Sequence, residues 1–444
     1  MTSSTSATRV VRTADGPLTV TQTDELLVAR GVRYGTAERF GAPVAVEPWT
    51  EPVDATRPGP HCPQVPNFIE HMMGAVLKGL QASEDCLVLS VHAPRDAAGL
   101  PVMVYYHGGA YVTGSGESAR YRPTRLVAEG NVVVVSVSYR VGIFGYLTPT
   151  REGVETNLGL RDQLLALQWV ARNIASFGGD PENVTIFGQS AGGDSVASLL
   201  LSEPALGLYQ RAILQSAPLG MRAGRAAMHR AVRAAADEVL RTRPRDISAE
   251  ELLEVQTIAS RVGREFGWTG GMPLGFHYGE YPLPPESEVP AVIARRAPDV
   301  DIMLLHMHDD ALPLAQIDQS LAPLMKFGRL GRVIVKGVAK IATARLFDLP
   351  ARRMARQWRA AGGKAAHYRM DWKPAHTEFG APHCLELPFL FGSDADWADA
   401  PMLGEYAGHA NERLPIGREL RAAWAQFAYD GTLPAQTSYL RRLS

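Results

Sequence analysis

The sequence predicts an α/β protein in which helices flank both sides of a mostly parallel central sheet. Short apolar runs rich in β-branched residues recur along the chain, and longer helix-compatible stretches separate them. The runs are apolar throughout rather than alternating, which is typical of strands buried on both faces of a parallel sheet. The alternation of strand and helix favours one open sheet with helices on both sides.

The elements follow in chain order. PLTVTQTDELLVARG (17–31) alternates around a polar turn and predicts a hairpin at a sheet edge. The strand candidates are 86–93, 101–107, 131–138, 183–187, 211–216, 301–306 and 366–372. Between the third and the fourth, the stretch 160–177 predicts a helix, because one helical face gathers Leu164, Leu167, Val170, Ile174 and Phe177.

The segment from about residue 222 to residue 283 differs from the rest. Two Ala- and Arg-rich helical pieces precede the Gly/Pro-rich passage GWTGGMPLGFHYGEYPLPP. We interpret residues 1–444 as a single domain, with this segment as an insertion packed on one edge of the sheet.

The bulk composition excludes several classes of protein. The 444 residues are 46% hydrophobic and 20% charged, and 45 basic side chains nearly balance 46 acidic ones, for a net charge of −1. No one-sided charge predicts nucleic acid or an anionic membrane as partner, and the basic run 351–364 is typical of a solvated helix face. No apolar run is long enough to span a bilayer, and no signal peptide is visible, so a cytoplasmic location is expected.

The strongest local motif is NVTIFGQSAGGDSVASLLL (183–201), where a strand leads through G-x-S-x-G into a helix. Small residues at 188, 191 and 192 permit a sharp turn that exposes Ser190 at the helix N-terminus, where partial positive charge favours a developing anion. The alternative is a purely structural glycine-rich turn in which the serine has no catalytic role. The flanking strand and helix favour Ser190 as a nucleophile.

A serine nucleophile also needs hydrogen-bond donors for the oxyanion. VYYHGGAYVTGSG (104–116) is a strand that runs into a glycine turn similar to the HGGG-type turns of lipases and esterases. We expect the backbone N–H groups of Gly109, Ala110 and Ala191 to be the donors.

These stretches resemble the type-B carboxylesterase/lipase family, which includes cholinesterases and para-nitrobenzyl esterases. GQSAGG, HGGAY, SEDCLVLSVHAP, LYQRAILQSA and APHCLELPFLFG occur in the family's order, and the resemblance spans roughly residues 11–434. It implies the α/β-hydrolase fold, an acyl-enzyme mechanism without a cofactor, and His383 as the catalytic base. His376 lies nearby, but nothing around it matches.

The acid of a triad in this fold falls between the serine and the histidine, at a strand end. LLHMHDDALP (304–313) is the expected place, and the resemblance puts Asp310 where the family usually has glutamate. Asp309 is the alternative. His306 and His308 also permit a metal site, because alternate residues of a strand share a side, but position 311 is Ala where such a motif needs another ligand.

Further expectations come from the resemblance alone. Glu84 and Arg140 match a buried ion pair, and Ser216 matches a residue that hydrogen-bonds the triad. Cys62 and Cys86 match a disulfide pair, which stays open because cytosolic thiols are usually reduced. Gln189 replaces a frequent glutamate beside the nucleophile, which argues against a cholinesterase-like preference for cations.

The function predicted is a serine carboxylesterase that acts on small-molecule esters, with Ser190, Asp310 and His383 as the triad and no metal or cofactor. Hydrolysis of amides, carbamates or thioesters by the same triad stays open, as does a catalytically inactive, cholinesterase-like binding protein. A metal-dependent hydrolase built on HMHDD is the third alternative. The sequence does not determine the oligomeric state.

Overall fold

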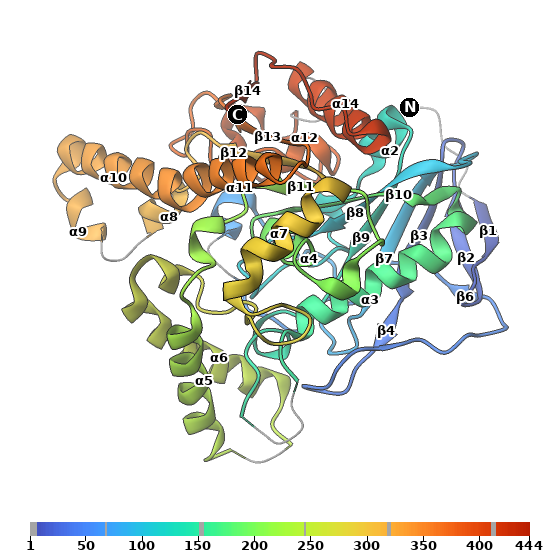
Figure 1. The fold of residues 1–444 in the computed structure, drawn as a ribbon, viewed down its shortest axis with the longest axis horizontal. Helices are drawn as coiled ribbons and strands as arrows, with labels where there is room; N and C mark the ends of the chain where they lie inside the picture. Colours follow the sequence, from blue (N-terminus) through green and yellow to red (C-terminus); the bar gives the residue numbers. More distant parts are fainter. Residues whose placement is uncertain (1–6, 67–68, 151–154, 244–245, 318–320, 410–413) are drawn as a thin grey trace.

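The computed structural model describes residues 7–66, 69–150, 155–243, 246–317, 321–409 and 414–444. Within these ranges a 12-stranded sheet crosses the molecule in the order β1-β2-β3-β7-β9-β8-β10-β11-β12-β13-β14, with β6 paired to β2 (Figure 1). Its strands are β1 (Ala7–Arg12), β2 (Pro17–Gln22), β3 (Leu26–Arg33), β6 (Val53–Asp54), β7 (Val88–Pro94), β8 (Leu100–Tyr106), β9 (Val133–Val137), β10 (Gly179–Gln189), β11 (Arg211–Gln215), β12 (Asp301–Met307), β13 (Ala365–Met370) and β14 (Leu440–Arg442); β4 (Gly35–Thr36) and β5 (Val44–Ala45) pair separately.

The seven strands expected from apolar runs are β7 to β13. The pairs from β9 through β8, β10, β11 and β12 to β13 are all parallel, whereas β7 is antiparallel to its neighbours. The N-terminal hairpin forms from β2 and β3. It does not lie at the edge, because β1 extends the sheet by one more, mostly exposed strand.

Helices cover both faces of the sheet (Figure 1). They are α1 (Glu70–Met73), α2 (Thr124–Gly130), α3 (Leu158–Asn173), α4 (Ala191–Leu199), α5 (Ala226–Leu240), α6 (Ala249–Gly263), α7 (Val289–Arg296), α8 (Leu312–Ile317), α9 (Ala322–Met325), α10 (Gly328–Thr343), α11 (Leu349–Ala360), α12 (Leu387–Leu390) and α14 (Pro415–Asp430). Among the described helices, none is long and apolar enough to cross a membrane.

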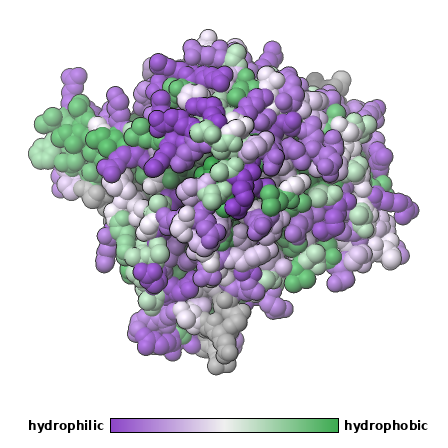
Figure 2. Space-filling view, in the orientation of Figure 1, coloured by the Kyte–Doolittle hydropathy of each residue, from purple (hydrophilic) through white to green (hydrophobic). Residues whose placement is uncertain are grey.

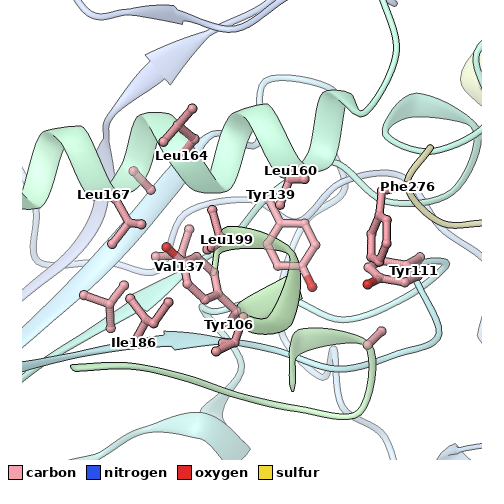
Figure 3. Packing of buried hydrophobic residues seen from close by; sticks show 14 of the residues in the cluster. Tyr106, Tyr111, Val137, Tyr139, Leu160, Leu164, Leu167, Ile186, Leu199 and Phe276 are labelled. Atoms are coloured by element: carbon pink, nitrogen blue, oxygen red, sulfur yellow. The ribbon is translucent and has the colours of Figure 1, made fainter. Parts of the chain in front are cut away.

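Each of the strands β8 to β13 contributes to two cores, because its side chains alternate between the faces of the sheet. On β8, Val104 and Tyr106 join the cluster beneath α3, α4 and α11, whereas Met103 and Tyr105 join the cluster beneath α2, α12 and α14. Figure 3 shows the first cluster, with Leu160 and Leu167 of α3 beside the sheet residues. Burial on both faces explains why these strands read as continuous apolar runs.

The segment expected as an insertion contains the helix pair α5 and α6, which lies below the sheet in Figure 1. Val232 of α5 and Leu252 of α6 are buried in the same cluster as the sheet residues. Arg222, at the start of the segment, forms an ion pair of 2.5 Å with Asp194 of α4. The helix pair therefore shares a core with the central sheet.

The expected pairing of Glu84 with Arg140 is wrong. Arg140 is buried and binds Asp162 of α3 through two nitrogens, at 2.9 Å from Nε and 2.7 Å from Nη2. Glu84 instead pairs with Arg39, and about a third of each side chain is exposed. Asp162 lies inside the helix that packs on the sheet, so it reaches the buried guanidinium that Glu84 does not.

Cys62 and Cys86 are free thiols, and both are buried. A hydrogen bond with Cys62, together with burial, raises the pKa of the Cys86 thiol. The Cys86 thiol is therefore protonated at neutral pH, and an unreactive packing role fits it.

Candidate active site

Ser190 lies on a sharp turn between β10 and α4. Its φ of 57° and ψ of −123° fall outside the regions that non-glycine residues favour. Two backbone hydrogen bonds hold the turn: the Ser190 N–H donates to the Gln215 carbonyl at 2.8 Å, and the Asp194 N–H donates to the Ser190 carbonyl at 2.9 Å. The strained conformation is thus held by the end of the adjacent strand β11 and by the first turn of α4.

The glycines around Ser190 are required by close backbone approach. A Cβ on Gly188 would lie 2.5 Å from the Gly192 carbonyl, and a Cβ on Gly192 would lie 2.0 Å from the Tyr106 carbonyl. These contacts are far below van der Waals separation, so the turn excludes larger residues. The prediction that small residues permit the elbow is met in this geometry.

His383 and Asp310 come together from distant segments. His383 Nδ1 lies 2.5 Å from Asp310 Oδ1, and both side chains are buried. The other carboxylate oxygen accepts hydrogen bonds from Ser216 Oγ at 2.8 Å and from the Met307 N–H at 2.9 Å. Because an ionised carboxylate only accepts, Nδ1 of His383 carries the proton and Nε2 is left as the acceptor.

Asp309, the alternative acid, is engaged elsewhere. Its carboxylate lies 2.8 Å from Lys373 Nζ, accepts from the Ala381 N–H at 3.0 Å and lies 2.9 Å from His308 Nδ1. These bonds tie the turn after β12 to the segment that leads into His383. Among the described residues, Asp309 makes no hydrogen bond with His383.

Nε2 of His383 is hydrogen-bonded to Gln189 and not to Ser190, the partner expected for a catalytic base. The Gln189 side-chain amide donates to it at 3.2 Å. The structure contains no hydrogen bond between Ser190 Oγ and His383 in the described part of the chain. In proteins without bound substrate, such contacts are often loose and tighten only when the reacting complex forms.

The glycine turn after β8 lies against the nucleophile. A Cβ on Gly108 would lie 3.1 Å from Ser190 Cβ. Gly109 and Ala110 have positive φ angles of 126° and 53°, which turns the backbone tightly. Their N–H groups and that of Ala191 donate no hydrogen bond to any described residue, so all three expected oxyanion donors are available.

His107, which begins this turn, is structural. Its ring stacks on Tyr139 with centroids 4.2 Å apart, and Nδ1 lies 2.8 Å from the Gly108 carbonyl. Burial lowers the pKa of His107 to about 4, so the ring is neutral near pH 7.

The two histidines of HMHDD do not converge on one point. His306 is buried, and its Nδ1 lies 2.8 Å from His367 Nε2 on β13, whereas His308 is partly exposed beside Asp309. Within the described residues, one group of three possible metal ligands contains His306, His367 and Asp348, with ligand atoms within 4.8 Å of one another. The two imidazoles already share a hydrogen bond, and Asp348 is ion-paired with Arg352, so this arrangement favours a polar network over a metal centre.

Two polar features beside the site escaped the sequence reasoning. Glu386, within the quoted stretch PHCLELPFLFG, is fully buried, and burial raises its pKa to about 7. Gln215 Nε2 donates to its Oε1 at 3.0 Å. Asp194 accepts a hydrogen bond from Tyr111 Oη at 2.9 Å and forms an ion pair with Arg222. An acid in an otherwise apolar run was the available signal for Glu386, whereas nothing local marks Arg222.

A pocket opens beside these residues. Its lining includes Gly108, Gly109, Gln189 and Cys384 from the segments described above. The remaining wall is mainly apolar and comes from Ile69, Met73, Val76 and Tyr121, with Glu70 as its one carboxylate. The wall of this pocket therefore presents a mainly apolar surface beside the glycine turn and Gln189.

Comparisons with known proteins agree with this geometry. The sequence model of the carboxylesterase family matches residues 8–273. A probable N-octanoylanthranilate hydrolase of Rhodococcus erythropolis is 35% identical over 93% of this chain and 90% of its own length, and a para-nitrobenzyl esterase of Bacillus subtilis is 33% identical over 88% and 83%. A solved PNB esterase structure superposes with a TM-score of 0.79 at 29% identity, covering 98% of this chain and 93% of that one. The chain belongs to the carboxylesterase family, and it is an ester hydrolase with the α/β-hydrolase fold.

Proposed function

We propose that Ser190, His383 and Asp310 form the catalytic triad of this esterase. Ser190 attacks the ester carbonyl while His383 Nε2 accepts its proton, and the same imidazolium then protonates the leaving alcohol. His383 next activates a water that releases the acid from the acyl-enzyme. Asp310 holds the ring in the required tautomer and stabilises its charged form. The observation that carries the proposal is the 2.5 Å contact between His383 and Asp310.

The oxyanion of each tetrahedral intermediate is proposed to bind the N–H groups of Gly109, Ala110 and Ala191. Each such donor typically contributes about 3 kcal/mol of transition-state stabilisation. Before the reaction, Gln189 must release His383 Nε2, since one lone pair cannot accept from both the amide and Ser190. Substrate entering the pocket beside Gln189 is the proposed trigger.

For the substrate, we propose esters with an apolar acyl chain, because the pocket wall is mainly apolar. A second candidate reaction is hydrolysis of an N-acyl bond. It is favoured by the relative from Rhodococcus erythropolis, a probable N-octanoylanthranilate hydrolase. N-octanoylanthranilate is an amide of an eight-carbon acid. Both reactions pass through the same acyl-enzyme, and they differ in the leaving group that His383 protonates.

The test is a panel of p-nitrophenyl esters of rising chain length and the matching p-nitroanilides. We assay the wild type, Ser190→Ala and the control Ser195→Ala, each with and without a chelator. The control makes the same change five residues further along the chain, in α4. We expect ester turnover that survives the chelator and disappears only in Ser190→Ala. An inactive wild type would support a binding protein, and activity lost with the chelator would support a metal-dependent reaction.

The cytoplasmic location stays a prediction from the sequence.

A further inference from the structure

The outer face of α10 is an exposed apolar surface. We define it as Phe327, Leu330, Val333, Ile334 and Ile341. Phe327, Leu330 and Val333 are 66%, 64% and 65% exposed, and Ile341 is 56% exposed. Figure 2 shows this hydrophobic surface where α9 and α10 project from the body of the molecule. Single exposed apolar residues are ordinary, but a contiguous group of large ones marks an interaction site.

The helical period explains how one helix carries two apolar faces. Leu330, Val333, Ile334 and Ile341 recur at spacings of three, four and seven, which places them on one side. Val335 and Ala339 lie on another side, where they are buried with Leu312 and Ala315 in a small core. The inner face therefore attaches α10 to the protein, and none of the described residues covers the outer face.

A row of cations borders the outer face. Its members are the exposed residues Lys326, Arg329, Arg332, Lys336 and Lys340, and the sequence has no Asp or Glu between Asp318 and Asp348. Among the described residues, none of the five forms an ion pair. The whole-chain charge of −1 conceals this local concentration, which is why composition predicted no anionic partner.

The charge decides which partner fits. A second copy of the chain, docked about a two-fold axis, would bring the two cationic rows together, and like charges disfavour that pairing. An anionic bilayer instead pairs with the cations while its acyl region takes up the apolar side chains. Lys and Arg side chains are long enough to reach phosphate groups while their stems lie along the apolar layer.

We propose that the outer face of α10 docks on the surface of an anionic phospholipid bilayer. The helix lies in the plane of the interface, with Leu330, Val333 and Ile334 inserted and the cations at the headgroups. α10 continues through the short helical segment Ala344–Asp348, where Phe347 contacts the His383 ring at a centroid distance of 5.5 Å. The docked helix thus leads into the segment that contacts the catalytic histidine, and we expect esters dissolved in the bilayer to become substrates, a consequence that rests on the proposed function.

Vesicle binding tests the docking step with the full chain. The protein is sedimented with vesicles of phosphatidylglycerol and phosphatidylcholine in equal parts, and with phosphatidylcholine alone. We expect binding to the anionic vesicles that weakens as salt is added, and far weaker binding to the neutral ones. Ser190→Ala protein is expected to bind as the wild type does, so the result is independent of catalysis.

Matched variants locate the surface. Val333→Glu is expected to reduce binding by at least about tenfold, whereas Val44→Glu, at a valine that is 61% exposed on β5, leaves it unchanged. Lys336→Glu with Lys340→Glu is expected to reduce binding by at least about 25-fold, since each cation near such a surface contributes about fivefold. Arg230→Glu with Arg261→Glu makes the same charge change on α5 and α6 and serves as its control.

Three results would overturn the proposal. The first is no binding to anionic vesicles by wild type. The second is an equal loss in the α10 variants and in their controls. The third is a concentration-dependent dimer, without lipid, that Val333→Glu dissociates, because this would assign the face to a second copy of the chain.

Discussion

Two strand-to-helix turns at the same edge of the sheet contribute to the active site, and they are built differently. The turn from β10 to α4 carries Ser190 and depends on the backbone: a strained φ angle and glycines pressed against Tyr106. The turn from β12 to α8 carries Asp310, and all five of its residues from His308 to Leu312 have side chains larger than glycine. Its geometry depends on side chains that other segments supply.

The difference separates local from long-range specification. Apart from its contacts with Gln215 and with the end of β8, the first turn is held by contacts within seven consecutive residues, 188–194. The second turn is fixed by Ser216 on Asp310, by Lys373 on Asp309, and by Thr343, whose Oγ accepts from the Ala311 N–H at 3.0 Å. Substitutions should therefore affect the two turns in different ways.

The largest effect is expected from Asp310→Asn. The amide cannot stabilise the imidazolium, and its N–H₂ group can face Nδ1 of His383 and favour the wrong tautomer, so kcat should fall about 10⁴-fold. Stopped assays with a p-nitrophenyl ester measure this. A loss below about tenfold would contradict the assignment of the acid.

The backbone-built turn is broken by Gly192→Ala. The new Cβ would lie 2.0 Å from the Tyr106 carbonyl and 2.6 Å from the His107 carbonyl, and backbone cannot yield as a side chain can. We expect about 3 kcal/mol of destabilisation in urea unfolding. Gly337→Ala is the control: it lies on exposed α10 with nothing within 4 Å of the added Cβ, and helix propensity should make it stabilising by about 1 kcal/mol.

Glu386 tests the side-chain-built region through pH. Burial raises the pKa of Glu386 to about 7 from its ordinary value of 4.5, so the unfolded chain loses this proton at a lower pH than the folded chain does. The contribution of Glu386 to the free energy of unfolding is therefore most favourable below about pH 4.5. It decreases by about 3 kcal/mol as the pH rises to about 7. Glu386→Gln removes this decline, and urea unfolding at about pH 4.5 and about pH 8 compares the two proteins. An equal decline in the variant would show that other groups cause it.

The same contrast explains what the sequence revealed of the fold. β7 to β13 were predicted because burial on both faces leaves a continuous apolar run in the sequence. α3 was predicted because burial of one helical face leaves a record of apolar residues at helical spacing. β1 left no such record, since four of its six residues are exposed before the first buried one. The inner and outer faces of α10 were missed because both are apolar, and only tertiary packing shows which one is covered.

For the site, Ser190 follows from a local motif, whereas His383 was identified through a resemblance to relatives. The pairing of Arg140 with Asp162, and of Asp194 with Arg222, joins segments 22 and 28 residues apart. No spacing rule selects such partners among many charged side chains. Asp309 and Asp310 remained alternatives for the same reason, because the contacts that distinguish them come from residues 216, 373 and 383.

A smaller effect is expected from Ser216→Ala. The hydroxyl donates to Asp310 Oδ2 at 2.8 Å, and the Met307 N–H remains as a second donor to that oxygen. Losing one hydrogen bond to a charged group costs about 2 kcal/mol, so kcat should fall about 30-fold. KM should not change, because Ser216 acts through the acid and does not touch substrate; a rise in KM alone would contradict this role.

The smallest effect is expected from Asp309→Asn. Its ion pair with Lys373 is partly exposed, with 45% of the Lys373 side chain open to solvent, and such pairs contribute less than about 1 kcal/mol after solvent screening. The asparagine carbonyl can still accept from the Ala381 N–H, so the segment before His383 keeps its anchor. Activity should therefore stay within about twofold of wild type, and a double-mutant cycle with Lys373→Met should give a coupling energy below about 1 kcal/mol. An equal loss of activity in Asp309→Asn and Asp310→Asn would contradict the separate roles given to the two carboxylates, Asp310 as the triad acid and Asp309 as an anchor of the turn.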